Sequence, residues 1–264
     1  MRLFILVVLL FSAASAAEAS EFAVDTVDLL APLGLDVNAA GPVLVRMDVD
    51  RGRLVVANTL SSSLSVIDCA SGAVKNIPLG GRAYQHLKSE AMTIDPGTGV
   101  VCLIGANRFF IVSPDRSESL SIPTGVQFES IAVDGSTGNI FLAGRESAGL
   151  GFYQPASGTL TTVDWLETSE PLINLNATPP PPIRRVISDG ALGRMVAVDG
   201  STATLRLFDP ATGRGDGGRP LPLPAGGRWH LAGYREDIHA LYLVAETAER
   251  KVVKAARIDV AGGG

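Results

Sequence analysis

The stretch 129–143, Glu-Ser-Ile-Ala-Val-Asp-Gly-Ser-Thr-Gly-Asn-Ile-Phe-Leu-Ala, decides the fold because its pattern occurs four times along the chain. In each copy an apolar run ends at an aspartate, a turn containing a glycine follows, and a second apolar run begins. The four aspartates are Asp50, Asp95, Asp134 and Asp189, and the glycines are Gly52, Gly99, Gly138 and Gly193. An aspartate can accept hydrogen bonds from the turn backbone, and glycine adopts positive φ, so each copy predicts a tight β-hairpin.

A second hairpin follows the first in most copies. The turn of this second hairpin has a similar sequence in three units, at segments 68–72 (DCASG), 154–158 (QPASG) and 209–213 (DPATG). A fourth strand completes each unit, and the units recur at roughly the 40–45-residue period of a propeller blade. The long interval before Asp189 contains a proline-rich insert, 171–182.

The sequence therefore predicts an all-β protein, a β-propeller of about five four-stranded blades. The predicted blades cover approximately residues 43–81, 88–125, 127–166, 183–227 and 228–260 of a single domain, 20–264. The last unit has three strands, and the strand 22–30 has no blade of its own. We expect this strand to pair with the last blade, which would close the ring and remove its open edge. A six- or seven-bladed ring with missing blades is the alternative.

Three segments carry a resemblance to a known family. The segments 54–58 (LVVAN) and 63–68 (SLSVID) of the first unit, and 204–209 (TLRLFD) of the fourth, are similar to the YVTN-type repeats of bacterial exported propellers. These repeats belong to the wider group of lactonase-like propellers. The resemblance implies the fold but no single activity, because similar propellers serve as binding proteins, lactonase-like enzymes and cofactor-bearing dehydrogenases.

The N-terminus has the order of a secretory signal peptide. Arg2 precedes an apolar run, 3–11, and the small residues Ala14, Ser15 and Ala16. We expect residues 1–19 to be removed on export, since the run is shorter than the ~20 residues of a membrane-spanning helix. The product is expected to be a periplasmic or secreted monomer with no membrane insertion after signal cleavage.

Charge and cysteine content narrow the possible partners. The net charge is −5 and the basic residues are scattered, which argues against nucleic acid as a partner. Two cysteines are too few for a disulfide scaffold. Export permits a bond between Cys69 and Cys102, whereas the apolar run around Cys102 favours a buried thiol.

No catalytic motif stands out, but one column of residues does. The sequence lacks a nucleophile elbow, a metalloprotease helix, a phosphate-binding loop and a Cys-x-x-Cys pair. Positions five residues before each turn aspartate should face the mouth of the central channel. They are Val45, Glu90, Glu129 and Arg184, with His230 as the counterpart in the fifth unit. The residues two positions further on are apolar and are expected in the core. These are Met47, Met92, Ile131, Val186 and Ala232.

The column suggests two kinds of ligand. Glu90 and Glu129 could hold a divalent cation such as Ca²⁺, which binds carboxylate oxygens. Arg184 and His230 could bind an anionic or polar group. The same side chains could instead be solvated or pair with one another, as polar strand ends often do.

Two aromatic residues in loops of the same face, Tyr84 and Trp229, could stack on a sugar or aromatic ring or pack against their neighbours. Short loops and the lack of a convergent acid–base set favour a binding or scaffold protein that needs no cofactor. It would recognise a small polar ligand or a periplasmic protein at the channel mouth. The alternative is a metal-assisted lactonase or esterase in which Glu90 and Glu129 hold a cation that polarises the substrate carbonyl. A glycosidase using the same two carboxylates is a third possibility.

Overall fold

The computed structural model describes residues 8–9, 24–25, 41–81, 91–144, 149–163, 184–199, 204–221, 228–246 and 252–261. Within these residues the regular structure is β-strand, apart from one 3-10 turn, η4 (Glu236–Ile238). The predicted all-β class is confirmed. No helix in the described part of the chain is long and apolar enough to cross a membrane.

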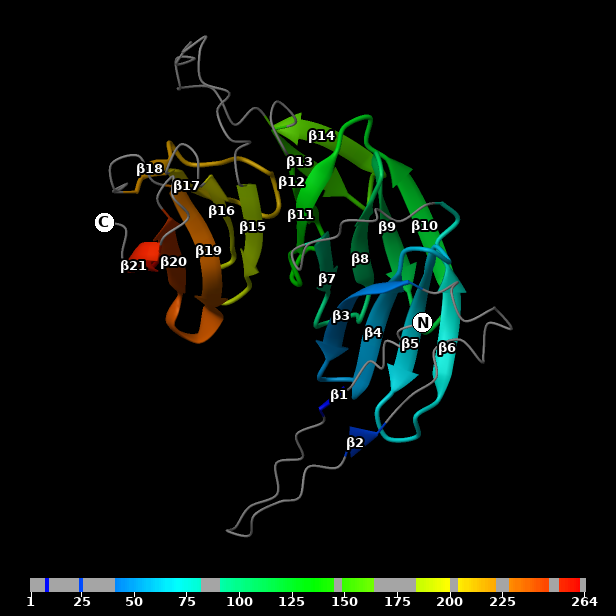
Figure 1. The fold of residues 1–264 in the computed structure, drawn as a ribbon. Helices are drawn as coiled ribbons and strands as arrows, with labels where there is room; N and C mark the ends of the chain where they lie inside the picture. The colour runs from blue at the N-terminus through cyan, green and yellow to red at the C-terminus, as the bar shows by residue number, and fades with distance from the viewer. Residues whose placement is uncertain are drawn as a thin grey trace, which may run out of the picture.

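Four sheets have four strands each, and in each sheet the strands pair antiparallel in chain order (Figure 1). The first contains β3 (Pro42–Asp48), β4 (Arg53–Asn58), β5 (Ser63–Asp68) and β6 (Val74–Pro78). The second contains β7 (Met92–Ile94), β8 (Val101–Gly105), β9 (Arg108–Ser113) and β10 (Glu118–Pro123). The third contains β11 (Phe128–Val133), β12 (Ile140–Gly144), β13 (Leu150–Gln154) and β14 (Thr159–Val163). The fourth contains β15 (Arg184–Asp189), β16 (Arg194–Asp199), β17 (Thr204–Phe208) and β18 (Arg219–Pro220).

The fifth sheet has three strands, β19 (Arg228–Arg235), β20 (Ala240–Glu246) and β21 (Val252–Asp259). The strand expected to complete it, 22–30, is described at β2 (Val24–Asp25), where it pairs with β1 (Val8–Leu9) instead. The expected pairing with the last blade is thus not formed at these two residues, and the number of blades in the complete ring stays a prediction.

The hairpin turns require one correction in the first unit. Asp48, and not Asp50, is the turn aspartate, because Asp48 pairs with Arg53 as the last pair of the β3–β4 hairpin. Gly52 follows it at the same spacing as in the other units and has a φ of 56°. Asp50 lies exposed inside the turn. The spacing to the glycine was the signal that separates the two aspartates. The equivalent set is therefore Asp48, Asp95, Asp134 and Asp189.

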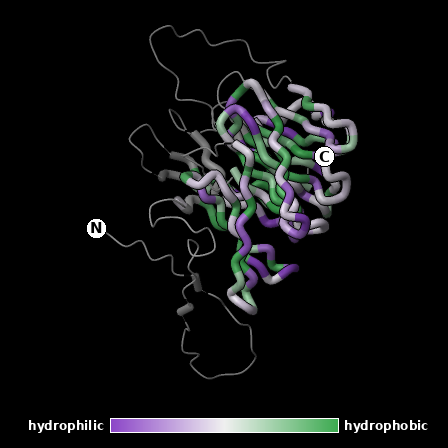
Figure 2. Tube along the Cα trace, turned by 90° about the vertical axis from the view of Figure 1, so that its right-hand side faces the viewer, coloured by the Kyte–Doolittle hydropathy of each residue, from purple (hydrophilic) through white to green (hydrophobic). Residues whose placement is uncertain are grey.

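Clusters of buried apolar residues join neighbouring sheets. Hydrophobic residues follow the strands along the chain trace in Figure 2. The largest cluster joins the first three sheets and contains the fully buried Phe109 and Phe110. Burying one such side chain stabilises the fold by about 1.5–3 kcal/mol. A second cluster, around Phe141, joins the third and fourth sheets, and a third, around Leu241, joins the fourth and fifth.

The first strand of each sheet lies on the inside of this arrangement (Figure 1). β3 contacts β7, β7 contacts β11, and β11 contacts β15. Side chains link these strands through backbone groups that the sheets leave open. Arg46 Nε donates to the Met92 carbonyl at 3.3 Å, and the Ser130 hydroxyl accepts from the Val186 amide at 3.1 Å.

Three of the predicted core positions on the inner strands are buried, namely Met92, Ile131 and Val186. Met47 is wrong as a core prediction because its side chain is 50% exposed. Met47 pairs with Leu54, on the face of the first sheet that turns away from the second sheet. This face has no following sheet in the series, which explains the exposure.

Candidate functional site

The structure describes the predicted channel-mouth residues to different extents. Glu129 is a half-buried residue of β11 and takes part in an interaction with its surroundings. Arg184 begins β15, and His230 is the third residue of β19. The structure describes the backbone of both residues. Glu90 lies outside the described residues.

The two aromatic predictions have similar outcomes. Tyr84 also lies outside the described residues, and Trp229 is described as a backbone position of β19.

Three of these residues lie at the same distance along the chain from a turn. Glu129, Arg184 and His230 each lie five residues before the residue that ends the inner strand or opens its turn. Their pairing differs, because Arg184 lies opposite Asp199, whereas a bulge between Leu231 and Gly233 shifts His230 by one residue, so that it lies opposite Val244. Glu129 is also the extra residue of a β-bulge, between the pairs formed by Phe128 and Ser130. A bulge redirects a side chain relative to the regular pleat and recurs beside binding sites. The corrected alignment gives Val43, rather than Val45, as the counterpart in the first sheet.

No metal site can be assigned from the described side chains. Within the described ranges, no three His, Cys, Asp or Glu side chains are grouped as ligands. Glu90 is outside those ranges, so a Ca²⁺ site with Glu129 stays a prediction. Cys69 and Cys102 are free thiols.

A polar cluster that the sequence did not reveal joins the fourth and fifth sheets. The buried carboxylate of Asp189 accepts hydrogen bonds from the Tyr234 hydroxyl and, at 2.9 Å, from the Leu192 amide. His239 Nδ1 lies 2.8 Å from Asp189 Oδ2, and the His239 backbone is left-handed with a φ of 47°. Glu236 Oε1 accepts from the amide of Gly190 at 2.9 Å. Of the six residues of this Asp189 cluster, Asp189, Gly190 and Leu192 lie in or beside one hairpin turn, and Glu236 and His239 lie in the other. The cluster therefore ties the two turns together.

Opposing effects set the protonation of Asp189. Burial would raise its pKa, but hydrogen bonds from Tyr234, Leu192 and His239 outweigh burial and hold the pKa below its ordinary value. The pKa of Tyr234 is raised, first by burial and then by its hydrogen bond to the Asp189 carboxylate. Asp189 is therefore an ionised acceptor, and Tyr234 a neutral donor, near pH 7.

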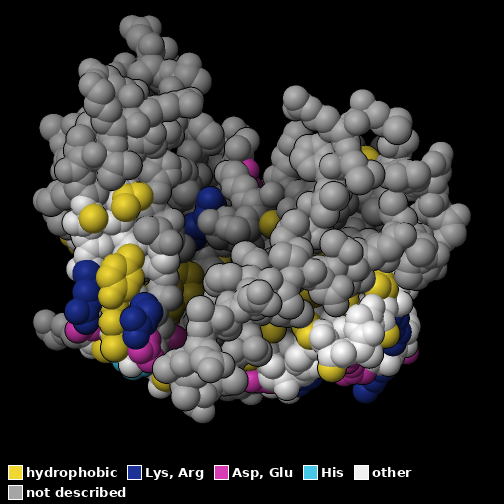
Figure 3. Space-filling view, turned by 60° about the horizontal axis from the view of Figure 1, so that its bottom comes forward, with side chains coloured by type: hydrophobic (Ala, Val, Ile, Leu, Met, Phe, Trp, Pro, Cys, Tyr) yellow, Lys and Arg dark blue, Asp and Glu magenta, His cyan; other side chains and the backbone are white. Residues whose placement is uncertain are grey.

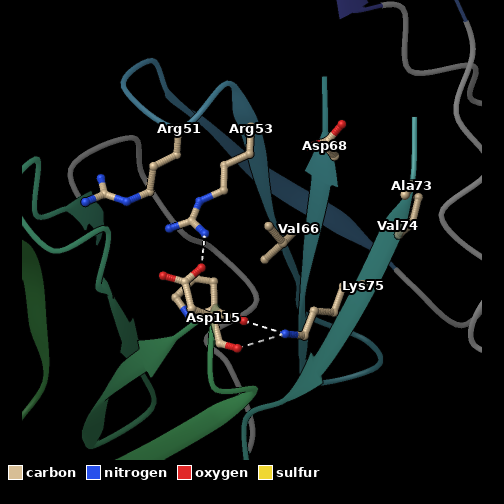
Figure 4. Close-up of a pocket in the computed structure, with 9 residues that line it drawn as sticks. Arg51, Arg53, Val66, Asp68, Ala73, Val74, Lys75 and Asp115 are labelled. Carbon is tan, nitrogen blue, oxygen red and sulfur yellow. Dashed lines mark hydrogen bonds and ion pairs between the residues drawn. The ribbon is translucent and has the colours of Figure 1, made fainter. Parts of the chain in front are cut away.

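A groove of about 660 Å³ lies between the first and second sheets (Figure 4). Arg53 crosses the junction beside it: Nε donates to Asp48 Oδ2 at 2.8 Å, and Nη2 donates to the Gly99 carbonyl at 3.1 Å. The third bond goes from Nη1 to Asp115 Oδ1 at 2.7 Å. The residues that line the groove come from three hairpins, which is why sequence periodicity did not reveal the groove.

Charges of both signs are mixed on the described surface. Figure 3 shows Lys and Arg side chains lying beside Asp and Glu side chains on the face in view.

Comparison with known proteins supports the fold and leaves the activity open. No family model matches the chain, and no curated protein sequence matches it. Among solved structures, hydrazine synthase of Kuenenia stuttgartiensis matches with a TM-score of 0.61 and 15% identity, covering 86% of this chain. The β-propeller domain of Cps50 (Swd1) from Myceliophteria thermophila matches with a TM-score of 0.58 and 9% identity, covering 79%. The chain spans 65% and 64% of those two chains. Together with the radial series of antiparallel sheets, these likenesses identify the fold as a β-propeller.

Proposed function

We propose that the protein is an exported, non-catalytic β-propeller that binds a small polar ligand at the mouth of its central channel. The observation that supports this most directly is that Glu129, Arg184 and His230 lie at the same distance along the chain from the turns that end three inner strands. β11 packs against β15, so the first two of these residues belong to neighbouring inner strands. In this proposal a carboxylate, a guanidinium and an imidazole belong to one rim.

The chemistry of the rim suits a ligand that carries both donors and an anionic group. An arginine can bind a carboxylate through two parallel hydrogen bonds, which fixes the orientation of the ligand. A glutamate accepts hydrogen bonds from hydroxyl or amine groups. Tyr84, together with Trp229 of β19, would provide a stacking surface at this mouth. A periplasmic protein that presents the same groups is the other partner considered in this proposal.

The test is a thermal-shift comparison with a panel of sugar acids, amino acids and neutral sugars. A ligand that binds the folded state at 100 times its Kd raises stability by about 2.7 kcal/mol. We expect a compound that stabilises the wild type and has no effect on Arg184→Gln or Glu129→Gln. Arg194→Gln is the matched control because Arg194 is a half-exposed residue of the neighbouring strand. Stabilisation that is unchanged in both mouth variants would contradict the proposal.

The metal-assisted hydrolase is tested in the same assay with CaCl₂. A rise in melting temperature that is lost in Glu90→Gln and in Glu129→Gln would support this alternative over simple binding. A melting temperature independent of Ca²⁺ would count against it. Mass spectrometry of the exported protein tests the proposed removal of residues 1–19, and light scattering tests the proposed monomer. We also propose that the protein belongs to the YVTN-type group of propellers.

A further inference from the structure

We propose that the groove between the first and second sheets is a second binding site, which takes a small dicarboxylate in place of the Asp115 carboxylate. It is distinct from the channel mouth: the mouth positions lie near the starts of the inner strands, whereas the groove is lined by residues that follow the end of β3 and by residues of the β5–β6 and β9–β10 hairpins.

The guanidinium of Arg53 is held in place to donate hydrogen bonds to an anion. Its side chain is 9% exposed and is fixed by Asp48 and by the Gly99 carbonyl, so two of its three hydrogen bonds are made inside the protein. The remaining partner, Asp115, has a side chain that is 70% exposed. The Asp115 carboxylate is therefore mostly solvated, and Asp48 and the Gly99 carbonyl still hold the guanidinium when another anion takes its place. Its position shows that a carboxylate fits against Nη1 of Arg53.

A second cation stands on the opposite wall (Figure 4). Lys75 Nζ donates to the Pro114 carbonyl at 2.7 Å and lies 3.4 Å from the Asp115 carbonyl. An ammonium has three donors, so it can bind a further acceptor alongside these two carbonyls. Asp115 lies between Arg53 and Lys75, which defines a place for an anion with a positive charge on each side.

The remaining acid of the groove does not compete for this place. The Asp68 carboxylate accepts hydrogen bonds from the Ser71 amide at 2.7 Å and from the Ser71 hydroxyl at 2.6 Å. Those bonds belong to the turn that follows β5. Once Asp115 swings out, Arg53 and Lys75 are left facing the groove.

Size and lining favour a short dicarboxylate. Small-molecule sites usually have volumes of about 300–1,000 Å³, and this groove lies within that range. The aliphatic side chains Val66 and Val74 line it between the charged walls. They would contact the methylene groups of the ligand while its two carboxylates meet Arg53 and Lys75.

The experiment is isothermal titration of the full chain with succinate at low ionic strength. Asp115→Asn removes the internal competitor, and we expect it to lower the Kd by about tenfold, the equivalent of one charge-assisted hydrogen bond. Lys75→Gln is expected to raise the Kd by a similar factor, and Lys75→Arg to restore binding. Inorganic phosphate, titrated in parallel, is expected to bind more weakly than succinate.

Matched controls separate this effect from a change in net charge. Asp237→Asn and Arg214→Gln remove one exposed charge of each sign from the fifth and fourth sheets. They should leave the Kd within about twofold, because neither residue lines the groove and exposed charges interact weakly in water. An unchanged Kd in Asp115→Asn would overturn the proposal, as would equal responses to succinate and phosphate in all variants. If Arg184→Gln or Glu129→Gln abolishes ligand binding at the channel mouth and leaves succinate binding intact, the two sites are distinct.

Discussion

Replacing Tyr234 by phenylalanine removes one oxygen from the junction between the fourth and fifth sheets and leaves the aromatic ring in place. The hydroxyl donates to the buried carboxylate of Asp189. The Leu192 amide and His239 remain as partners of that carboxylate. The variant therefore tests a single hydrogen bond to an ionised acceptor.

The expected loss follows from that geometry. A hydrogen bond to a charged group contributes about 1.5–3 kcal/mol, and Asp189 has no exposed surface through which water could replace the donor. We expect Tyr234→Phe to lower the free energy of unfolding by about 2 kcal/mol. In a protein of this size that corresponds to a fall in melting temperature of about 4–8 °C.

The effect also has a predicted pH dependence. Because the pKa of Asp189 is lowered below 3.8 in the folded state, the ionised carboxylate stabilises the fold above about pH 4. This stability is lost as the pH falls through the folded-state pKa. The difference between the wild type and Tyr234→Phe should therefore shrink as the pH falls below about 4.

Calorimetry at several pH values measures both quantities. Tyr242→Phe is the control, because Tyr242 lies on the adjacent strand β20 and is partly exposed. The reasoning is refuted if Tyr234→Phe melts within 1 °C of Tyr242→Phe. A difference that stays constant down to pH 3 would also refute it.

Other substitutions test the turns, the core and the thiols. Gly138→Ala should destabilise by about 1–2 kcal/mol because Gly138 has a φ of 72°, whereas Gly217→Ala has open space around it and should change little; urea titration measures both. Phe110→Ala should cost about 3–5 kcal/mol by the same measurement, since the ring is fully buried between sheets, and a loss under 1 kcal/mol would contradict its place in the core. Burial raises the pKa of the Cys102 thiol to about 12, so Ellman's reagent should modify Cys102 only after unfolding, while Cys69 should react slowly in the native state.

Local patterns in the sequence were sufficient to predict the antiparallel sheets. The spacing from Asp134 to Gly138 predicted a hairpin that the structure contains, because an aspartate and a glycine specify the turn without help from distant residues. The first unit was misaligned because it contains both Asp48 and Asp50; the four-residue spacing to Gly52 and the pairing with Arg53 both identify Asp48 as the turn residue.

The sites between sheets could not be predicted in the same way. Asp189 and Tyr234 are 45 residues apart, and Arg53 and Asp115 are 62 residues apart. Each pair meets because two sheets pack face to face, and no repeat spacing encodes which polar side chains then come into contact. The channel mouth could be proposed from the sequence because its positions recur at a fixed distance from each turn, and this site stays a prediction.

The chain-order pairing of strands has a consequence for how the protein is made. Ribosomes add about 5–20 residues per second, so one unit of roughly 40 residues takes seconds to appear. A β-hairpin forms in about 1–10 μs, and no strand of the four-stranded sheets must wait for a partner from a later unit. Each nascent sheet can therefore form before the next one is translated. Until the second sheet is complete, the first keeps its apolar inner face, with Val55 and Leu64, open to other nascent chains, and this interval is when aggregation is most probable.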